Sequence, residues 1–99
     1  SAGDLTKFMV GLETGSLIGG AQRERLLYSL SHHPYRYGIP TGSQAREVYD
    51  KVGFLWNYVH DTAIVRHPRG TYVMTIMTQG KSYAAIAAMT RDIERIMYP

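Results

Sequence analysis

The chain has 99 residues and is 44% hydrophobic, which suits one small domain with a modest core and argues against disorder. Its net charge is only +3 and its basic residues are scattered without a recognition motif, so nucleic-acid binding is not expected. The absence of cysteine excludes disulfides and thiolate metal sites, and no apolar run reaches the ~18 residues of a membrane helix.

Two helices are predicted in the first third of the chain. Ser1 and Asp4 have the spacing of a capping box, and the residues after them repeat an apolar side chain every three or four positions. These apolar residues are Leu5, Phe8, Met9 and Leu12. A second helix is predicted from about 21 to 31, with its leucines inward and Arg23 outward, and it ends before Pro34.

Residues 34–44 contain two prolines and two glycines and are predicted to form a loop. Three strands are expected after it, at 46–52, 60–66 and 71–78. Proline and glycine within 67–70 indicate a tight hairpin between the last two strands. The link at 53–59 is interpreted as a longer, aromatic-rich hairpin loop, in which Trp56, Asn57 and Tyr58 form a site wall or pack locally.

A last helix is predicted over 82–97, capped by Ser82. One of its faces carries Ile86, Met89, Ile93 and Ile96. The order ααβββα therefore predicts an α+β fold, with an antiparallel three-stranded meander, two N-terminal helices and one C-terminal helix.

The third strand is apolar on both faces between Tyr72 and Met77. In a three-stranded meander this strand lies at an edge, where an apolar strand is a site for pairing or aggregation. We therefore expect a partner strand at Tyr72–Met77, from a missing N-terminal part of the same protein or from a second copy. A non-catalytic domain that self-associates through this edge is the alternative to an enzyme.

Several short motifs occur in a definite order. They are Asp4-Leu5 through Met9, Thr14-Gly15-Ser16-Leu17, Lys51-x-Gly53, and Asp61-x-Ala63-Ile64-Val65, followed by the strand over 73–78 and the terminal helix. In this order and spacing, all 99 residues resemble the C-terminal portion of the class A β-lactamase and penicillin-binding-protein-like serine hydrolases. The resemblance implies a β-lactamase-like fold and, in the intact protein, acyl transfer from a β-lactam or a peptidoglycan-like amide.

The family's chemistry also needs a Ser-x-x-Lys nucleophile pair and a Ser-Asp-Asn-type loop, and the chain contains neither. The resemblance therefore implies that residues 1–99 are the C-terminal part of a hydrolase domain whose nucleophile lies upstream. Such a segment is expected to be inactive alone. A secreted or cell-envelope parent, and a link to antibiotic resistance, follow from the resemblance only.

The resemblance gives roles to four consecutive residues. Lys51 would attract the substrate carboxylate, and Gly53 would let substrate approach the strand. Phe54 would offer its backbone N–H as one oxyanion-hole donor. Val52 departs from the family, which has threonine or serine there, so it removes a hydroxyl that helps to bind the carboxylate. The alternative interpretations need no function: Lys51 is a solvated lysine, Gly53 an ordinary strand glycine and Phe54 a core residue.

His60 and Asp61 are adjacent, which invites a catalytic or metal-binding interpretation. Consecutive strand residues point to opposite faces, so this pair cannot easily share one ligand. We expect structural roles for both, and we assign no metal and no cofactor.

Overall fold

The structure is a computed structural model that describes all residues from 1 to 99. Its elements in chain order are α1 (Ala2–Thr14), α2 (Gly20–His32), α3 (Ile39–Gly42), β1 (Glu47–Leu55), β2 (Tyr58–His67), β3 (Gly70–Gln79) and α4 (Tyr83–Met97). The strands form one antiparallel sheet in the order β1-β2-β3. The predicted α+β class and the order of its helices and strands are confirmed, with β3 at one edge and β1 at the other.

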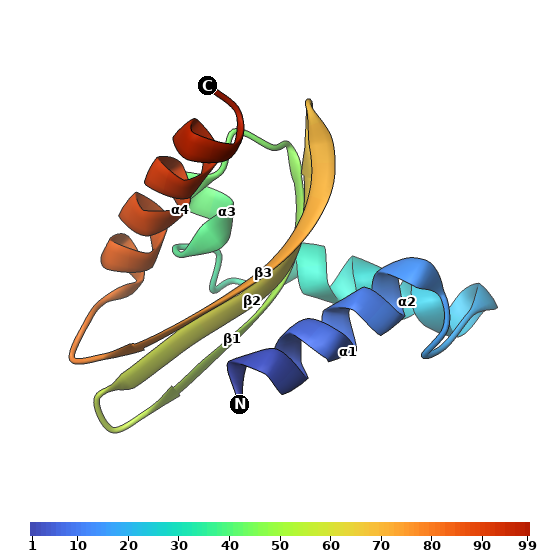
Figure 1. Cartoon of the computed structure of the whole chain (residues 1–99). Coiled ribbons are helices and arrows are strands. Elements are labelled where there is room, and N and C mark those ends of the chain that lie inside the picture. The colour runs from blue at the N-terminus through green and yellow to red at the C-terminus, as the bar shows by residue number, and fades with distance from the viewer.

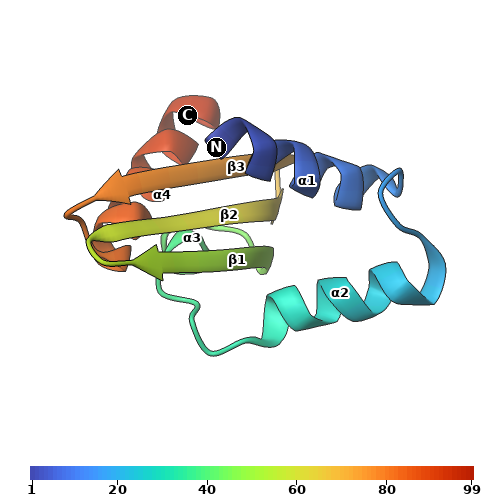
Figure 2. The same cartoon turned by 90° about the horizontal axis from the view of Figure 1, so that it is seen from below.

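The sheet lies between two layers of helices (Figures 1 and 2). Helices α3 and α4 cover one face, and α1 and α2 cover the other. Because side chains alternate along a strand, each face has its own core. The α3/α4 face buries Ile39, Val48, Ala63, Val65, Ile76 and Ile86. The α1/α2 face buries Met9, Leu12, Leu27, Leu30 and Ile64.

The helix ends follow their sequence signals. The Ser1 hydroxyl accepts a hydrogen bond from the Asp4 N–H at 3.2 Å, within the predicted capping box. The Ser82 hydroxyl accepts from the Ala85 N–H at 3.3 Å and so caps α4. No helix is long and apolar enough to cross a membrane.

Three local predictions were wrong. The segment 34–44 is not loop throughout, because Pro40 occupies the first turn of α3, where its missing N–H costs nothing. Strand β1 does not stop at Val52 but continues to Leu55, which pairs with Tyr58. The link to β2 is therefore a two-residue turn rather than a long loop.

This turn depends on Trp56, which takes a positive φ of 56°. Two-residue hairpins need such a conformation, and glycine, asparagine or aspartate usually supplies it. The sequence has no glycine at this turn, so its pattern does not indicate a two-residue hairpin.

Three side chains face the opposite way from their predicted orientation. Phe8 is 42% exposed and Ile96 is 80% exposed, although both were placed on apolar helix faces. Arg23, predicted to point outward, turns in and donates to the backbone oxygens of Leu12 and Glu13 at 2.7 and 2.9 Å. It thereby ties the start of α2 to the C-terminal end of α1, whose last carbonyls lack helical partners.

Candidate functional site

The predicted site residues lie along β1, and the outer edge of this strand pairs with no other strand. Lys51 is exposed and lies on the α1/α2 face, where it pairs in register with Thr62 of β2. An unpaired strand edge presents backbone N–H and C=O groups that can bond to an extended ligand. The strand thus combines an accessible ammonium group with free backbone donors and acceptors.

A groove runs beside this strand, between β1, the end of α2 and the segment that follows α2. It has a volume of about 390 Å³ and contains both apolar and polar side chains. Its lining residues are Leu26, Ser29, Leu30, His33, Pro34, Tyr35, Asp50, Lys51 and Val52. A concave, largely apolar surface with a single exposed cation suits a small ligand that carries one negative charge.

Val52 and Gly53 differ in what surrounds them. Val52 is half-buried on the α3/α4 face and pairs with Asp61. Gly53 pairs with His60, and a Cβ at Gly53 would lie 2.1 Å from the His60 Cε1 atom. The His60 ring therefore lies directly over the Gly53 backbone. Gly53 is needed at this position because of a neighbouring side chain, which is a reason that the sequence did not suggest.

Phe54 is not a core residue, because its side chain is 65% exposed. Leu55 and Trp56 continue this exposure, at 63% and 89%. Trp56 and Asn57 form the tip of the hairpin and Tyr58 begins β2, and none of the three lines the groove. The interpretation of 56–58 as a site wall receives no support from this arrangement.

His60 and Asp61 point to opposite faces of the sheet. The His60 ring lies over Gly53, whereas the Asp61 carboxylate accepts a hydrogen bond from the Ile39 N–H at 2.9 Å on the α3 side. No group of three or more histidine, aspartate and glutamate side chains is placed to hold a metal ion.

A row of hydroxyl groups crosses the α1/α2 face next to Lys51. The Thr62 and Thr75 hydroxyls are 2.7 Å apart, and the Thr75 and Thr6 hydroxyls are 2.8 Å apart. The row fixes α1 on the sheet through polar contacts. It begins at the residue that pairs with Lys51, so it extends the polar surface of the site into the sheet.

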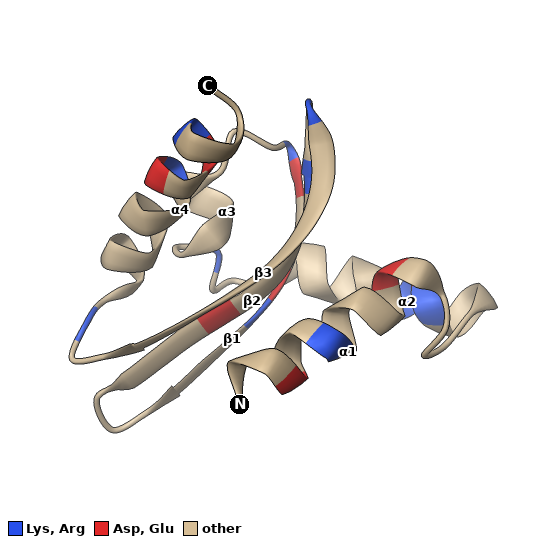
Figure 3. Ribbon diagram, in the orientation of Figure 1, with Lys and Arg blue, Asp and Glu red and all other residues tan.

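The groove rests on a buried polar cluster that the sequence analysis missed. Asp50 is fully buried, and its Oδ1 atom lies 2.7 Å from His33 Nε2 and 3.0 Å from Arg36 Nη1. Burial raises the pKa of Asp61, and the hydrogen bond and negative charge of Asp50 raise it further. Figure 3 shows acidic residues in the middle of the sheet, between the helical layers.

A third buried carboxylate, Glu94, lies in the C-terminal half of α4 and belongs to a separate cluster. Glu94 accepts hydrogen bonds from the Ser43 hydroxyl, the Gln44 N–H and the Tyr72 hydroxyl. Burial alone would raise the pKa of Glu94, but these three donors together hold it below its usual value. The same contact and burial raise the pKa of the Tyr72 hydroxyl. This cluster joins α4 to β3 and to the segment after α3, and it is structural.

Solved structures with a similar fold include PBP-A and two β-lactamases. PBP-A has a TM-score of 0.83 and 22% identity over 95% of this chain and 38% of its own. A β-lactamase from Sphaerobacter thermophilus has a TM-score of 0.81 and 20% identity over 97% of this chain and 40% of its own. A β-lactamase from Chitinophaga pinensis has a TM-score of 0.72 and 17% identity, over 95% and 39%.

At these identities the likeness shows the fold alone, and the chain spans about 40% of the length of these proteins. No curated protein matches the sequence significantly. The family model named Beta-lactamase2, described as the β-lactamase enzyme family, matches residues 1–98. The resemblance in the order of the motifs is therefore confirmed, and the chain belongs to the β-lactamase enzyme family.

Proposed function

We propose that this chain forms the substrate-binding side of a serine hydrolase active site, in a longer protein whose remaining part supplies the nucleophile. The observation that carries the proposal is the position of Lys51. It is exposed on an edge strand, beside a groove of about 390 Å³, in a chain of the β-lactamase enzyme family. The exposed ammonium is placed to attract the carboxylate of a β-lactam or of a peptidoglycan-like amide.

The reaction we propose is acyl transfer to a serine of the remaining part. The serine oxygen attacks the acyl carbon while its proton passes to a neighbouring base, and the amide C–N bond then breaks as the nitrogen takes up a proton. Water hydrolyses the resulting ester and returns the serine hydroxyl. The Phe54 N–H is proposed to stabilise the negative charge on the acyl oxygen during both steps.

PBP-A supports this choice of substrate, because one structure of a PBP-A mutant is an acyl-enzyme complex with penicillin G. Val52 limits how the carboxylate of such a substrate can be bound. It keeps the shape of a threonine but cannot donate a hydrogen bond to a carboxylate. We therefore propose a hydrolase in which Lys51 carries more of the carboxylate binding, and a secreted or cell-envelope location where such substrates occur.

The experiment is covalent labelling by a fluorescent penicillin. The isolated chain should not be labelled, because it has no Ser-x-x-Lys pair. The longer protein should be labelled, and Lys51→Ala should slow labelling by about tenfold to a hundredfold, the value of one charged hydrogen bond. Lys81→Ala, at another exposed lysine outside the groove, is the matched control. Labelling of the isolated chain, or equal rates for the two variants, would refute the proposal.

Strand β3 favours a second candidate function, self-association. It is an edge strand, and Met77 is 51% exposed on it. Such an edge can pair with the remaining part of the protein or with a second copy. If a second copy pairs there, light scattering after size exclusion should detect a dimer that Met77→Lys abolishes. Ile96→Lys changes an 80% exposed apolar residue on α4 and is the control. A monomer at all concentrations would exclude self-association.

A further inference from the structure

Two buried aspartates lie close together on the α3/α4 face of the sheet, opposite the face that carries Lys51. Asp50 of β1 and Asp61 of β2 are both 0% exposed. In the strand register Asp50 pairs with Ala63 and Asp61 pairs with Val52, so the aspartates are diagonal neighbours on the α3/α4 face. Two carboxylates in one buried site repel each other unless one of them is protonated.

Each carboxylate has one oxygen that is bonded and one that is not. Asp50 Oδ1 contacts His33 and Arg36, and Asp61 Oδ2 accepts from the Ile39 N–H. Asp50 Oδ2 and Asp61 Oδ1 are buried without any hydrogen-bond partner. A buried polar atom without a partner is costly, and two unpaired acceptors cannot satisfy each other. One proton between the two carboxyl groups satisfies both.

Counting the charges leads to the same proton. The Tyr35 N–H donates to His33 Nδ1 at 3.2 Å, so Nδ1 is an acceptor and carries no proton. His33 is then neutral, and its Nε2–H donates to Asp50 at 2.7 Å. Arg36, which contacts Asp50, is left as the one full positive charge that acts on both carboxyl groups. Only one ionised carboxylate is balanced, and the other must be neutral.

The aspartate pair is bonded to the segment 33–39, which follows α2. Its partners are His33 and Arg36 in the connection between α2 and α3, and Ile39, the first residue of α3. The same connection supplies Pro34 and Tyr35 to the wall of the groove. Gly38 approaches so closely that a Cβ there would lie 2.6 Å from Asp61 Oδ2. The connection therefore lies directly on the two carboxyl groups.

We propose that Asp50 and Asp61 share one proton at neutral pH and together position the segment 33–39, the wall of the Lys51 groove, on the sheet. Asp61 donates through Oδ1 to Asp50 Oδ2 and still accepts from the Ile39 N–H. Asp50 stays ionised and paired with Arg36. This proposal goes beyond the proposed function and does not depend on it, since it concerns a proton and a segment of backbone whether or not the groove binds a substrate.

The surroundings of the pair support this assignment of the proton. Burial raises the pKa of Asp61 most, and Asp50 adds to this, while the Ile39 N–H and Arg36 oppose it. The other titratable groups that act on the pair are His33 from the connection, which is bonded to Asp50, and Tyr83 from α4. The neighbours from β3 in the core are Met74 and Ile76, which carry no charge.

The sign of the pH dependence follows. Asp61 ionises at about pH 4 in the unfolded chain and at a higher pH in the folded chain. Its contribution to stability is complete below about pH 4 and is lost as the pH rises toward the folded pKa. Over that range the folded state holds one proton more than the unfolded state, so each pH unit raises the unfolding constant up to about tenfold.

The first experiment is ¹³C NMR of the aspartate carboxyl carbons of the unmodified chain between pH 3 and 8. We expect one carboxyl of the pair to keep the chemical shift of a protonated acid at pH 7. The amide signals of Tyr35 and Ile39 should stay fixed while that proton is held. Two carboxyl carbons that both ionise near pH 4 would overturn the proposal.

The second experiment compares two amide variants by urea unfolding. Asp61→Asn can donate to Asp50 and accept from the Ile39 N–H, so it should fold and should flatten the pH dependence between pH 5 and 8. Asp50→Asn removes the charge that Arg36 needs and should be much less stable. Asp92→Asn, at a 70% exposed side chain, is the control. An unchanged pH dependence in Asp61→Asn would overturn the proposal, even if Asp50→Asn fails to fold.

Discussion

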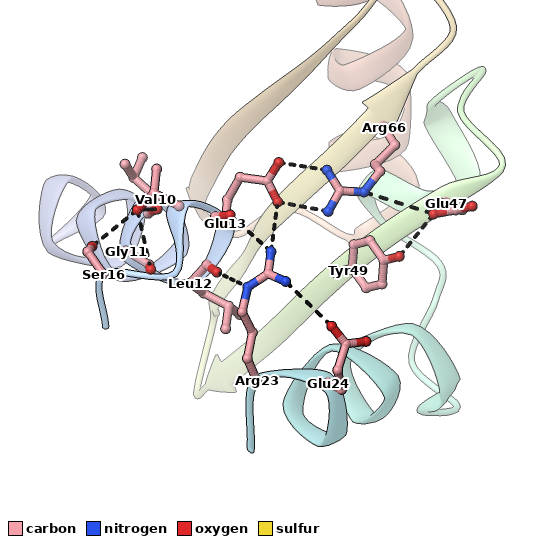
Figure 4. A network of polar contacts seen from close by, with 11 residues as sticks. Val10, Gly11, Leu12, Glu13, Ser16, Arg23, Glu24, Glu47, Tyr49 and Arg66 are labelled. Atoms are coloured by element: carbon pink, nitrogen blue, oxygen red, sulfur yellow. Dashed lines mark hydrogen bonds and ion pairs between the residues drawn. The ribbon is translucent and has the colours of Figure 1, made fainter. Parts of the chain in front are cut away.

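Two ionic clusters connect the helices to the sheet, and the pKa of the carboxyl at the centre of each is shifted in the opposite direction. At the C-terminal end of α1, Glu13 accepts two hydrogen bonds from Arg66 at 2.6 and 2.8 Å, with Arg23 at 3.6 Å (Figure 4). On the α3/α4 face of the sheet, Asp50 and Asp61 have one arginine, Arg36, near them. Glu13 has two arginines beside it, whose other partners, Glu24 and Glu47, are largely exposed, whereas two fully buried aspartates share one arginine.

The difference in burial and in directly bonded partners sets the direction of each pKa. The hydrogen bonds from Arg66 hold the pKa of Glu13 below its usual value, although partial burial opposes them. Burial and Asp50 hold the pKa of Asp61 above its usual value. The Glu13 cluster is therefore lost in acid, while the aspartate pair is weakened as the pH rises. The lesson is that burial and the groups in direct contact decide the protonation of a carboxyl, more than the type of residue does.

The largest effect is expected from Asp50→Ala. The change leaves Arg36 and His33 without their buried acceptor and leaves a void between them. Removing one partner from a buried charged cluster costs about 3–5 kcal/mol, and we expect the lower part of that range because Arg36 is 28% exposed. Urea unfolding at constant m-value measures the loss. A loss below about 1 kcal/mol would place this cluster in the same class as a surface ion pair.

The next effect is expected from Gly38→Ala. The new methyl group would lie 2.6 Å from Asp61 Oδ2 and 3.3 Å from Ile86 Cγ2, so the aspartate pair or the connection must shift. Overpacking of this kind costs about 1–3 kcal/mol. Gly3→Ala is the matched control, because the nearest atom to its Cβ is at 3.8 Å and alanine favours helix α1. Equal stability of the two variants would show that the connection is not held tightly.

A smaller effect is expected from Arg66→Ala in the other cluster. Both partners are partly exposed, with Arg66 at 31% and Glu13 at 24%, so we expect a loss of about 1 kcal/mol from the paired hydrogen bonds. Arg66→Lys keeps the charge but cannot bond both carboxylate oxygens of Glu13 in the same way, so it should recover only part of this loss. Arg25→Ala, at an exposed arginine of α2, should change little. Thermal unfolding checks all three variants.

The smallest effect is expected from salt and acid on Glu13. Its contribution is present above about pH 4.5 and is lost as the pH falls through its lowered folded value. Glu13→Gln should weaken the acid loss of stability by a few tenths of a kcal/mol, and 0.5 M NaCl should do the same. The aspartate pair is fully buried, so its pH dependence should survive the salt. A salt effect on both clusters alike would contradict the comparison.

The sequence predicted the order of the elements well, because their periodicity and caps are local signals. It also identified the family through motifs that lie at fixed positions in this fold. It failed where tertiary contacts decide. The short helix α3 and the inward turn of Arg23 depend on packing partners that are distant in sequence. Asp50 and Asp61 look like ordinary polar strand residues until the register makes them neighbours.

The candidate site residues come from the strand motif, and the sequence alone does not describe their surroundings. Lys51 is exposed at a groove, as its proposed role requires, and the residues that line the groove from α2 could not be found from the strand motif. The roles of Lys51, Val52, Gly53 and Phe54 remain proposals. The steric reason for Gly53 needed the position of a side chain on the neighbouring strand.

The contact between Gly53 and His60 restricts the order in which this site can diverge. Any side chain at position 53 would occupy the space of the imidazole ring, with 2.1 Å between a Cβ there and His60 Cε1. If position 60 becomes small first, position 53 can become larger without an overlap, whereas the reverse order requires the His60 ring to turn away from its place. A library that varies both positions should return alanine at 53 only together with a small residue at 60. Recovery of alanine at 53 beside an unchanged His60 would show that the ring can move aside.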